Sequence, residues 1–253
     1  MPRLDCPKPS KNQLFFFCIK RLSGHTFSAM ATGCLSRRVV RHHSEHLTNL
    51  NNDIMSVLVA KEAPDFKAAA AMPDGSIGEI QLSSLRGKYV ILFFWPLDFT
   101  FVCPTEIIAM DHRQPKFAEL GVEVIGVSID SQFTHHAWRN TPVDKGGIGP
   151  VKFPIVADLN HRITQAYGVE HPEANVAMRG TFLIDKDGIV QSQTVNNLPL
   201  GRNIDEHLRV VEALQYFEAN GEVCPAGWQK GQSGMTPDAD GVASYLAANA
   251  EKL

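Results

Sequence analysis

The chain has little of what marks secreted, membrane-spanning or nucleic-acid-binding proteins. Its 253 residues include only five cysteines, an odd number scattered at positions 6, 18, 34, 103 and 224. Such scattering does not resemble the dense disulfide framework of a small secreted domain, and it favours reduced thiols in a cytosol-like compartment. No hydrophobic run approaches the length that crosses a bilayer. A formal net charge of -3 gives no overall basic field for nucleic acid.

The composition, 44% hydrophobic and 20% charged, is that of a globular protein with a sizeable core. The charge is uneven, because residues 1–54 hold eight Lys and Arg against three Asp and Glu, whereas the rest holds 16 against 24. We interpret 1–54 as a basic, disordered N-terminal extension without a function of its own, since Met55 opens what reads as a folded domain. This interpretation places the protein in the cytoplasm. The alternative is an organellar transit peptide, which would place it in a mitochondrion or another organelle.

From Met55 onward, short apolar runs alternate with amphipathic segments. The run "YVILFFWP" (Tyr89–Pro96) is typical of a strand buried on both faces, and the following segment has helical spacing with a kink expected at Pro115. Further strands are expected at 122–130 and 153–158 and as one hairpin within 179–195, and helices at 103–121, 131–140, 160–168 and 203–221. The pattern predicts an α/β domain over 55–220, with a central mixed sheet flanked by helices.

Residues 221–253 are rich in Gly, Pro and polar residues. They are predicted to form an extended C-terminal tail that ends in a short helix.

Cys103 lies where the buried strand gives way to a helix, with Pro104 expected in the first helical position. Unpaired N–H groups and the helix dipole favour an anion there, so the position suits a nucleophilic thiolate. Position alone leaves open a second interpretation, that Cys103 is a small core residue. The hydroxyl of Thr100 is expected near the sulfur, and Pro96 could shield the loop from water. Glu106 stands where a dithiol oxidoreductase has its second cysteine, which disfavours simple thiol-disulfide exchange.

Two segments carry a family resemblance. "PLDFTFVCPTE" resembles the peroxidatic-cysteine segment of the peroxiredoxins, with the pattern P-x-x-x-T-x-x-C, and "GEVCPAGW" resembles the resolving-cysteine segment of their typical two-cysteine subgroup. The resemblance runs from Met55 to Leu253 and includes "GVSIDSQFTHHAWRN", "GGIGPVKFPIVAD", "YGVEHPEANVAMRGTFLID" and "NNLPLGRNIDEHLR". It implies a thioredoxin-like fold.

The resemblance also implies a site. Cys103 would attack the O–O bond of a hydroperoxide and become a sulfenic acid, while Thr100 would hydrogen-bond the thiolate and the peroxide. Arg179 would keep the sulfur charged and stabilise the charge that develops on the oxygens. Pro96 would be the shielding proline, and Glu106 would orient the arginine.

Cys224 from another subunit would then condense with the sulfenic acid to a disulfide. The segment Gly146–Gly149 resembles one half of the family's hyperoxidation-sensitivity pair. The other half, a Tyr-Phe pair, is replaced here by Tyr245-Leu246, which leaves the sensitivity open.

By the same resemblance, the partners would be a hydroperoxide substrate and thioredoxin or a related disulfide reductase, and homodimers would assemble into a ring of dimers. No cofactor and no metal is called for, and the dispersed histidines are expected to be ordinary polar positions. Two alternative functions are an oligomeric holdase chaperone or redox-signalling scaffold, and general thiol-disulfide exchange. The absence of a second cysteine near Cys103 argues against the latter.

Overall fold

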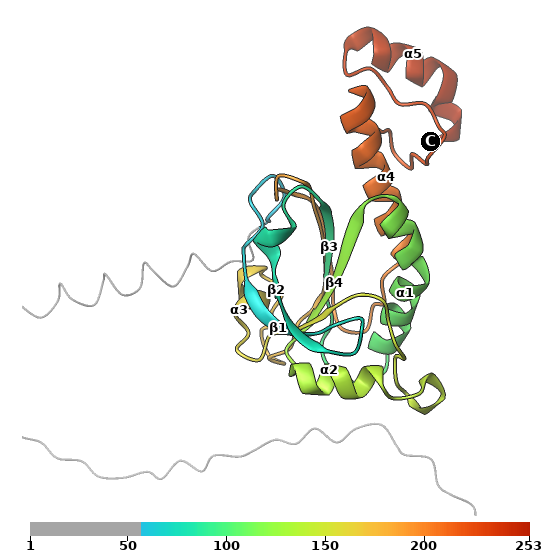
Figure 1. Cartoon of the computed structure of the whole chain (residues 1–253). Coiled ribbons are helices and arrows are strands. Elements are labelled where there is room, and N and C mark those ends of the chain that lie inside the picture. Colours follow the sequence, from blue (N-terminus) through green and yellow to red (C-terminus); the bar gives the residue numbers. More distant parts are fainter. Residues whose placement is uncertain (1–56) are drawn as a thin grey trace, which may run out of the picture. The chain divides into compact units, whose positions relative to one another are not determined.

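The computed structural model describes residues 57–253 (Figure 1). The predictions for residues 1–54, disorder and the alternative transit peptide, therefore lie outside the described residues. Among the helices of 57–253, none combines the length and apolarity needed to span a bilayer.

The centre of the described region is one seven-stranded sheet with the strand order β2-β1-β5-β4-β3-β6-β7. The strands are β1 (Lys67–Ala71), β2 (Ile77–Gln81), β3 (Tyr89–Phe94), β4 (Val122–Ser128), β5 (Ile155–Ala157), β6 (Arg179–Ile184) and β7 (Val190–Asn196). β3, β4 and β5 run parallel to one another, and the remaining neighbours are antiparallel. The predicted mixed sheet is confirmed.

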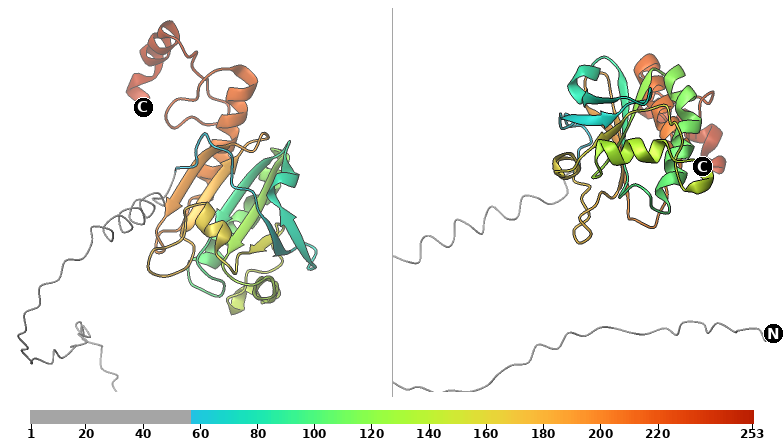
Figure 2. Two further views of the ribbon diagram at one scale, coloured as in Figure 1. Left: turned by 90° about the vertical axis from the view of Figure 1, so that its left-hand side faces the viewer. Right: turned by 60° about the horizontal axis from the view of Figure 1, so that its bottom comes forward.

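Helices cover both faces of this sheet. The helices of the described region are α1 (Cys103–Glu119), α2 (Gln132–Arg139), α3 (Arg162–Ala166), α4 (Ile204–Asn220) and α5 (Ala239–Asn249), with short 3₁₀ helices at Leu82–Leu85, Val143–Lys145 and Ala250–Lys252. α5 lies away from the sheet (Figure 1), and none of its residues is buried. α1 and α4 lie along one face and α3 lies on the other (Figures 1 and 2). These positions confirm the predicted helices, including the helix near the C-terminus, and α1 continues across Pro115.

The prediction of a single hairpin was wrong, because β1 and β2 form a second one at an edge of the sheet. β1 reads "KAAAA", which has neither the alternation nor the β-branched residues that indicate a strand. The usable signal was the turn before β2, where Gly75 adopts a positive φ of 86° that suits glycine.

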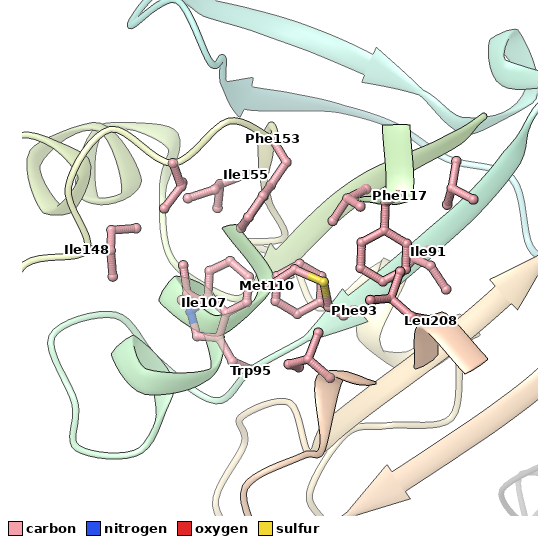
Figure 3. Packing of buried hydrophobic residues seen from close by; sticks show 14 of the residues in the cluster. Ile91, Phe93, Trp95, Ile107, Met110, Phe117, Ile148, Phe153, Ile155 and Leu208 are labelled. Atoms are coloured by element: carbon pink, nitrogen blue, oxygen red, sulfur yellow. The ribbon is translucent and has the colours of Figure 1, made fainter. Parts of the chain in front are cut away.

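Two hydrophobic clusters, one on each face, fix the sheet between the helices. All six residues of β3 are buried, as a central strand requires. On the α1 and α4 side, Phe93 and Trp95 pack with Ile107, Met110 and other residues of the cluster (Figure 3). Cys103 belongs to this cluster, so the end of β3 and the start of α1 are held by the same core.

Residues 221–238 contain no helix or strand, but they are not simply extended as predicted. After Gly221 caps α4 with a φ of 69°, the chain turns back and packs on α4. Trp228 is only 2% exposed, and its ring lies 4.9 Å from that of Tyr216 on α4. The burial of this indole explains why a Gly- and Pro-rich segment adopts a defined position.

Candidate active site

Cys103 is the first residue of α1, and its side chain is buried in the core cluster with 1% of the residue exposed. Pro104 is therefore the second helical residue and not the first, a shift of one position that leaves its missing N–H equally harmless. The preceding Val102 gives no side-chain cap to the helix. The N-terminus of α1 therefore presents uncapped backbone dipoles on the side of the sulfur, an environment that favours an anion.

Arg179 lies directly beside the sulfur. It is the first residue of β6, which pairs antiparallel with β3 and so places its start next to the loop that follows β3. Its Nη1 donates to Cys103 Sγ at 3.4 Å and to Glu106 Oε2 at 2.6 Å, while its Nε donates to the carbonyl of Leu198 at 2.7 Å. The guanidinium is thereby fixed with one edge toward the sulfur.

A second arginine, Arg202, completes the cluster, although it was not among the predicted site residues. Its Nε donates to Glu106 Oε1 at 2.8 Å and its Nη2 to Glu106 Oε2 at 3.1 Å, and its backbone N–H also donates to Oε1 at 2.9 Å. Its Nη1 donates to the carbonyl of Gly180 at 2.8 Å, and the guanidinium carbon lies 5.3 Å from the centroid of the Phe93 ring. Burial lowers the pKa of Arg202, and the charge of Glu106 opposes this effect.

The charges of this cluster do not balance while Cys103 carries its proton. Two buried guanidinium groups face a single buried carboxylate, Glu106. With a neutral thiol the cluster carries one net positive charge in a site of low dielectric, whereas with a thiolate it is neutral. The uncompensated positive charge lies beside the Cys103 sulfur, where it can stabilise negative charge that develops during a reaction.

Thr100 and Pro96 both lie in the loop between β3 and α1. The Thr100 hydroxyl donates to the carbonyl of Leu97 at 2.8 Å, so its hydrogen is not directed at the Cys103 sulfur as the resemblance implied. Its oxygen keeps lone pairs that can accept a hydrogen bond. Pro96 is buried, two residues after the end of β3. Its role as a shield stays a prediction.

A buried polar network holds the start of this loop. Asp98 accepts hydrogen bonds from Trp95 Nε1 at 2.9 Å and from His135 Nδ1 at 2.6 Å, and its own N–H donates to Asp130 at 2.9 Å. Burial raises the pKa of Asp98, and its hydrogen bond to His135 acts in the opposite direction. His135 is fully buried, so the expectation that it is an ordinary polar position was wrong. Position in the sequence gave no sign of its carboxylate partner.

Cys224 lies in the segment that packs on α4. Its Sγ donates to the carbonyl of Ala213 at 3.4 Å, and burial raises the pKa of its thiol. Cys103 and Cys224 are both free within the described chain. The structure thus brings Cys103, Arg179 and Glu106 together, but it does not join Cys224 to them within one chain.

Comparison with known proteins agrees with this geometry. The family model described as the AhpC/TSA family matches residues 59–193, and that of the C-terminal domain of 1-Cys peroxiredoxin matches residues 213–248. The chain is 52% identical over 189 residues to peroxiredoxin-2 of Macaca fascicularis, covering 75% of this chain and 95% of the relative. It is 58% identical over 199 residues to alkyl hydroperoxide reductase C of Helicobacter pylori strain J99, covering 78% of this chain and all of the relative.

Solved structures give the same result. The reduced 2-Cys peroxiredoxin of Plasmodium vivax superposes with a TM-score of 0.74 at 50% identity, covering 76% of this chain and 100% of that one. The mitochondrial 2-Cys peroxiredoxin of Plasmodium falciparum superposes with a TM-score of 0.64 at 46% identity, covering 66% of this chain and 100% of that one.

Proposed function

The chain belongs to the AhpC/TSA family of peroxiredoxins and is a peroxidase with a thioredoxin-like fold, and on this premise we propose that Cys103 is its peroxidatic cysteine. The observation that carries the proposal is the 3.4 Å hydrogen bond from Arg179 Nη1 to Cys103 Sγ at the start of α1. A buried sulfur beside a guanidinium and a helix N-terminus is held as a nucleophile.

In the first step the thiolate sulfur attacks one oxygen of a hydroperoxide. The S–O bond forms as the O–O bond breaks, and the leaving oxygen takes a proton and departs as water or an alcohol. Arg179 faces the sulfur and stabilises the negative charge that develops on the oxygens. The oxygen of Thr100, whose own hydrogen is held by Leu97, accepts a hydrogen bond from the O–H of the peroxide. Pro96 keeps water from the loop.

In the second step Cys224 of a partner subunit attacks the sulfenic sulfur of Cys103. The Cys224 thiol gives up its proton, the S–S bond forms as the S–O bond breaks, and the departing hydroxide takes up a proton from solvent to leave as water. Because Cys103 is buried, the first turn of α1 has to unwind before the two sulfurs meet. Unwinding has to break the hydrogen bonds from Thr105 N and Glu106 N to the carbonyl of Val102, at 3.0 and 3.4 Å.

Turnover then needs an external dithiol, for which we propose thioredoxin or a related disulfide reductase. The described region has only two cysteines, and the disulfide consumes both. A reducing compartment such as the cytoplasm would supply the dithiol. Because Cys224 of one subunit reacts with Cys103 of the other, a homodimer is the functional unit. We expect such dimers to assemble into a ring.

The test compares Cys103→Ser and Cys224→Ser in the full-length chain. Peroxide should convert the reduced wild-type protein into a dimer on non-reducing gels, and neither variant should form it. Cys224→Ser should still consume one equivalent of peroxide and give a Cys103 sulfenic acid that dimedone traps, whereas Cys103→Ser should consume none. Peroxide consumption by Cys103→Ser at the wild-type rate would contradict the proposal.

A further inference from the structure

The segment that carries Cys224 is anchored on α4 by a definite set of contacts. We call residues 221–237 the resolving segment. Its Glu222 accepts a hydrogen bond from the Tyr216 hydroxyl at 2.5 Å, and its Gly234 N–H donates to the same hydroxyl at 3.0 Å. The ring of Trp228 packs on that of Tyr216 at a tilt, and Trp228 is almost fully buried. Tyr216 therefore holds both ends of the resolving segment against α4.

Arg209, two turns before Tyr216 on α4, holds the middle of the segment. Its Nη1 donates to the carbonyl of Trp228 at 3.2 Å. Its Nε and Nη2 donate to the two oxygens of Glu206 at 2.7 and 2.6 Å. The guanidinium is thus oriented by Glu206 from within the same helix, which leaves one nitrogen for the resolving segment.

The same guanidinium acts on Cys224. The Cys224 thiol donates to Ala213, the residue one turn after Arg209 on the same face of α4. Burial raises the pKa of the Cys224 thiol, and the positive charge of Arg209 acts in the opposite direction. In return, the hydrogen bond to Glu206 raises the pKa of Arg209 most, and the charge of Cys224 adds to this effect.

The other charged or titratable groups around Cys224 are engaged elsewhere. On α4, Glu206 binds Arg209, Glu212 faces Lys230 at 3.5 Å, and Tyr216 donates to Glu222 of the resolving segment. Arg209 is therefore the cation of this neighbourhood that favours a thiolate at Cys224.

We propose that Arg209 is a positioning residue for the resolving step. It fastens the resolving segment through the Trp228 carbonyl, and its charge stabilises the thiolate that Cys224 forms before it attacks the Cys103 sulfenic acid of the partner subunit. The resting thiol, hydrogen-bonded to Ala213, releases its proton to solvent, and the hydroxide displaced from Cys103 takes up a proton in turn. This inference rests on the proposed role of Cys224.

The experiment separates the two steps by rapid mixing of the full-length, reduced protein with hydrogen peroxide across a series of pH values. Three variants are compared with the wild type: Arg209→Gln, Arg209→Lys and the control Arg113→Gln. Arg113 makes an equivalent two-pronged pair with Asp205, at 2.8 and 2.7 Å, but has no hydrogen bond to the resolving segment. Of the two kinetic phases that follow mixing, the first reports oxidation of Cys103, and the second reports formation of the disulfide with Cys224.

Arg209→Gln should leave the first phase unchanged, slow the second by about tenfold near neutral pH and move its pH profile to higher pH, as expected for a thiolate that forms less readily. More Cys103 should reach the sulfinic level at a given peroxide dose, because a longer-lived sulfenic acid meets more peroxide. Arg209→Lys keeps the charge and should keep the pH profile. Arg113→Gln should match the wild type in both phases.

A second phase of unchanged rate in Arg209→Gln would overturn the inference, and so would a slower phase with an unshifted pH profile, since loosened packing alone would produce that result. If Arg209→Gln fails to fold, the test compares Arg209→Lys with Arg209→Met, which keeps the length of the side chain without its charge. Failure of the proposed function looks different. In that case Cys224→Ser would show the same second phase as the wild type, whatever the behaviour of the Arg209 variants.

Discussion

Glu106 holds Arg202 with both carboxylate oxygens, at 2.8 Å to Nε and 3.1 Å to Nη2, and both side chains are buried. The same carboxylate accepts from Arg179, so one anion orients two cations around the sulfur of Cys103. A lone arginine beside the thiol would be free to turn away, whereas this arrangement fixes it. Two guanidinium groups face one carboxylate, so one positive charge is left uncompensated. That charge lies on the side of the cluster that faces the sulfur.

Arg202→Lys should slow the reaction of Cys103 with hydrogen peroxide by about tenfold, because one ammonium cannot reproduce the fork that grips Glu106. Arg179→Lys should slow it more, since Arg179 itself donates to the sulfur. The second-order rate constant of the first oxidation step measures both effects. Arg113→Lys, at an exposed pair with Asp205, is the control and should react like the wild type. Equal rates for Arg202→Lys and the wild type would show that Arg202 serves the fold alone.

Glu106→Gln should lower the free energy of unfolding by about 3 kcal/mol, because it removes the one carboxylate that pairs with both buried guanidinium groups. Denaturant unfolding of the reduced protein at fixed protein concentration measures this change. The matched control is Glu206→Gln, which also removes a glutamate from an arginine pair but at a half-exposed position. Its cost should stay below about 1 kcal/mol. Similar losses in the two variants would contradict the buried-charge explanation.

The sequence predicted those strands and helices whose own residues show a clear hydrophobic pattern. β3 is an unbroken apolar run, and α1 follows it with helical spacing, so the position of Cys103 at their junction followed from the sequence. Arg202 and His135 could not be found in this way. Each is a polar residue whose burial depends on a partner far along the chain, Glu106 in one case and Asp98 in the other.

The packing of the resolving segment was missed for the same reason. A Gly- and Pro-rich stretch reads as an extended tail unless the surface that buries it is known. Here that surface is α4, where the ring of Trp228 packs against the ring of Tyr216. The site residues Thr100 and Pro96 lie in the expected loop, but the hydrogen bond of the Thr100 hydroxyl to Leu97 was not foreseeable from the motif.

We expect the lowered pKa of His207 to make the folded protein less stable in acid. Burial first, and the charge of Arg202 second, lower its pKa from 6.5 to about 4. Between these two values the unfolded chain binds a proton that the folded protein does not, so the free energy of unfolding falls as the pH drops from 6.5 to 4. The contribution of this one group is up to about 3 kcal/mol.

His207→Gln removes that titration and keeps a polar side chain at the same place on α4. The free energy of unfolding of the wild type minus that of the variant should therefore be constant above pH 6.5 and should fall as the pH drops to 4. Denaturant unfolding at several pH values measures it, and carboxylates that titrate in both proteins cancel in the difference. Parallel curves for the two proteins over this range would contradict the assignment.

Deletion of residues 1–54 should leave peroxide turnover and thermal stability unchanged, because residues 57–253 contain both hydrophobic clusters and the whole arginine and cysteine site. A slightly longer deletion, of residues 1–65, is the matched control. It also removes Leu58 and Ala63, which are buried in the second cluster and whose N–H groups donate to Gln193 and to the carbonyl of Gly188. The longer deletion should lower the melting temperature while the shorter does not. Equal destabilisation by both would mean that residues 1–54 support the folded domain.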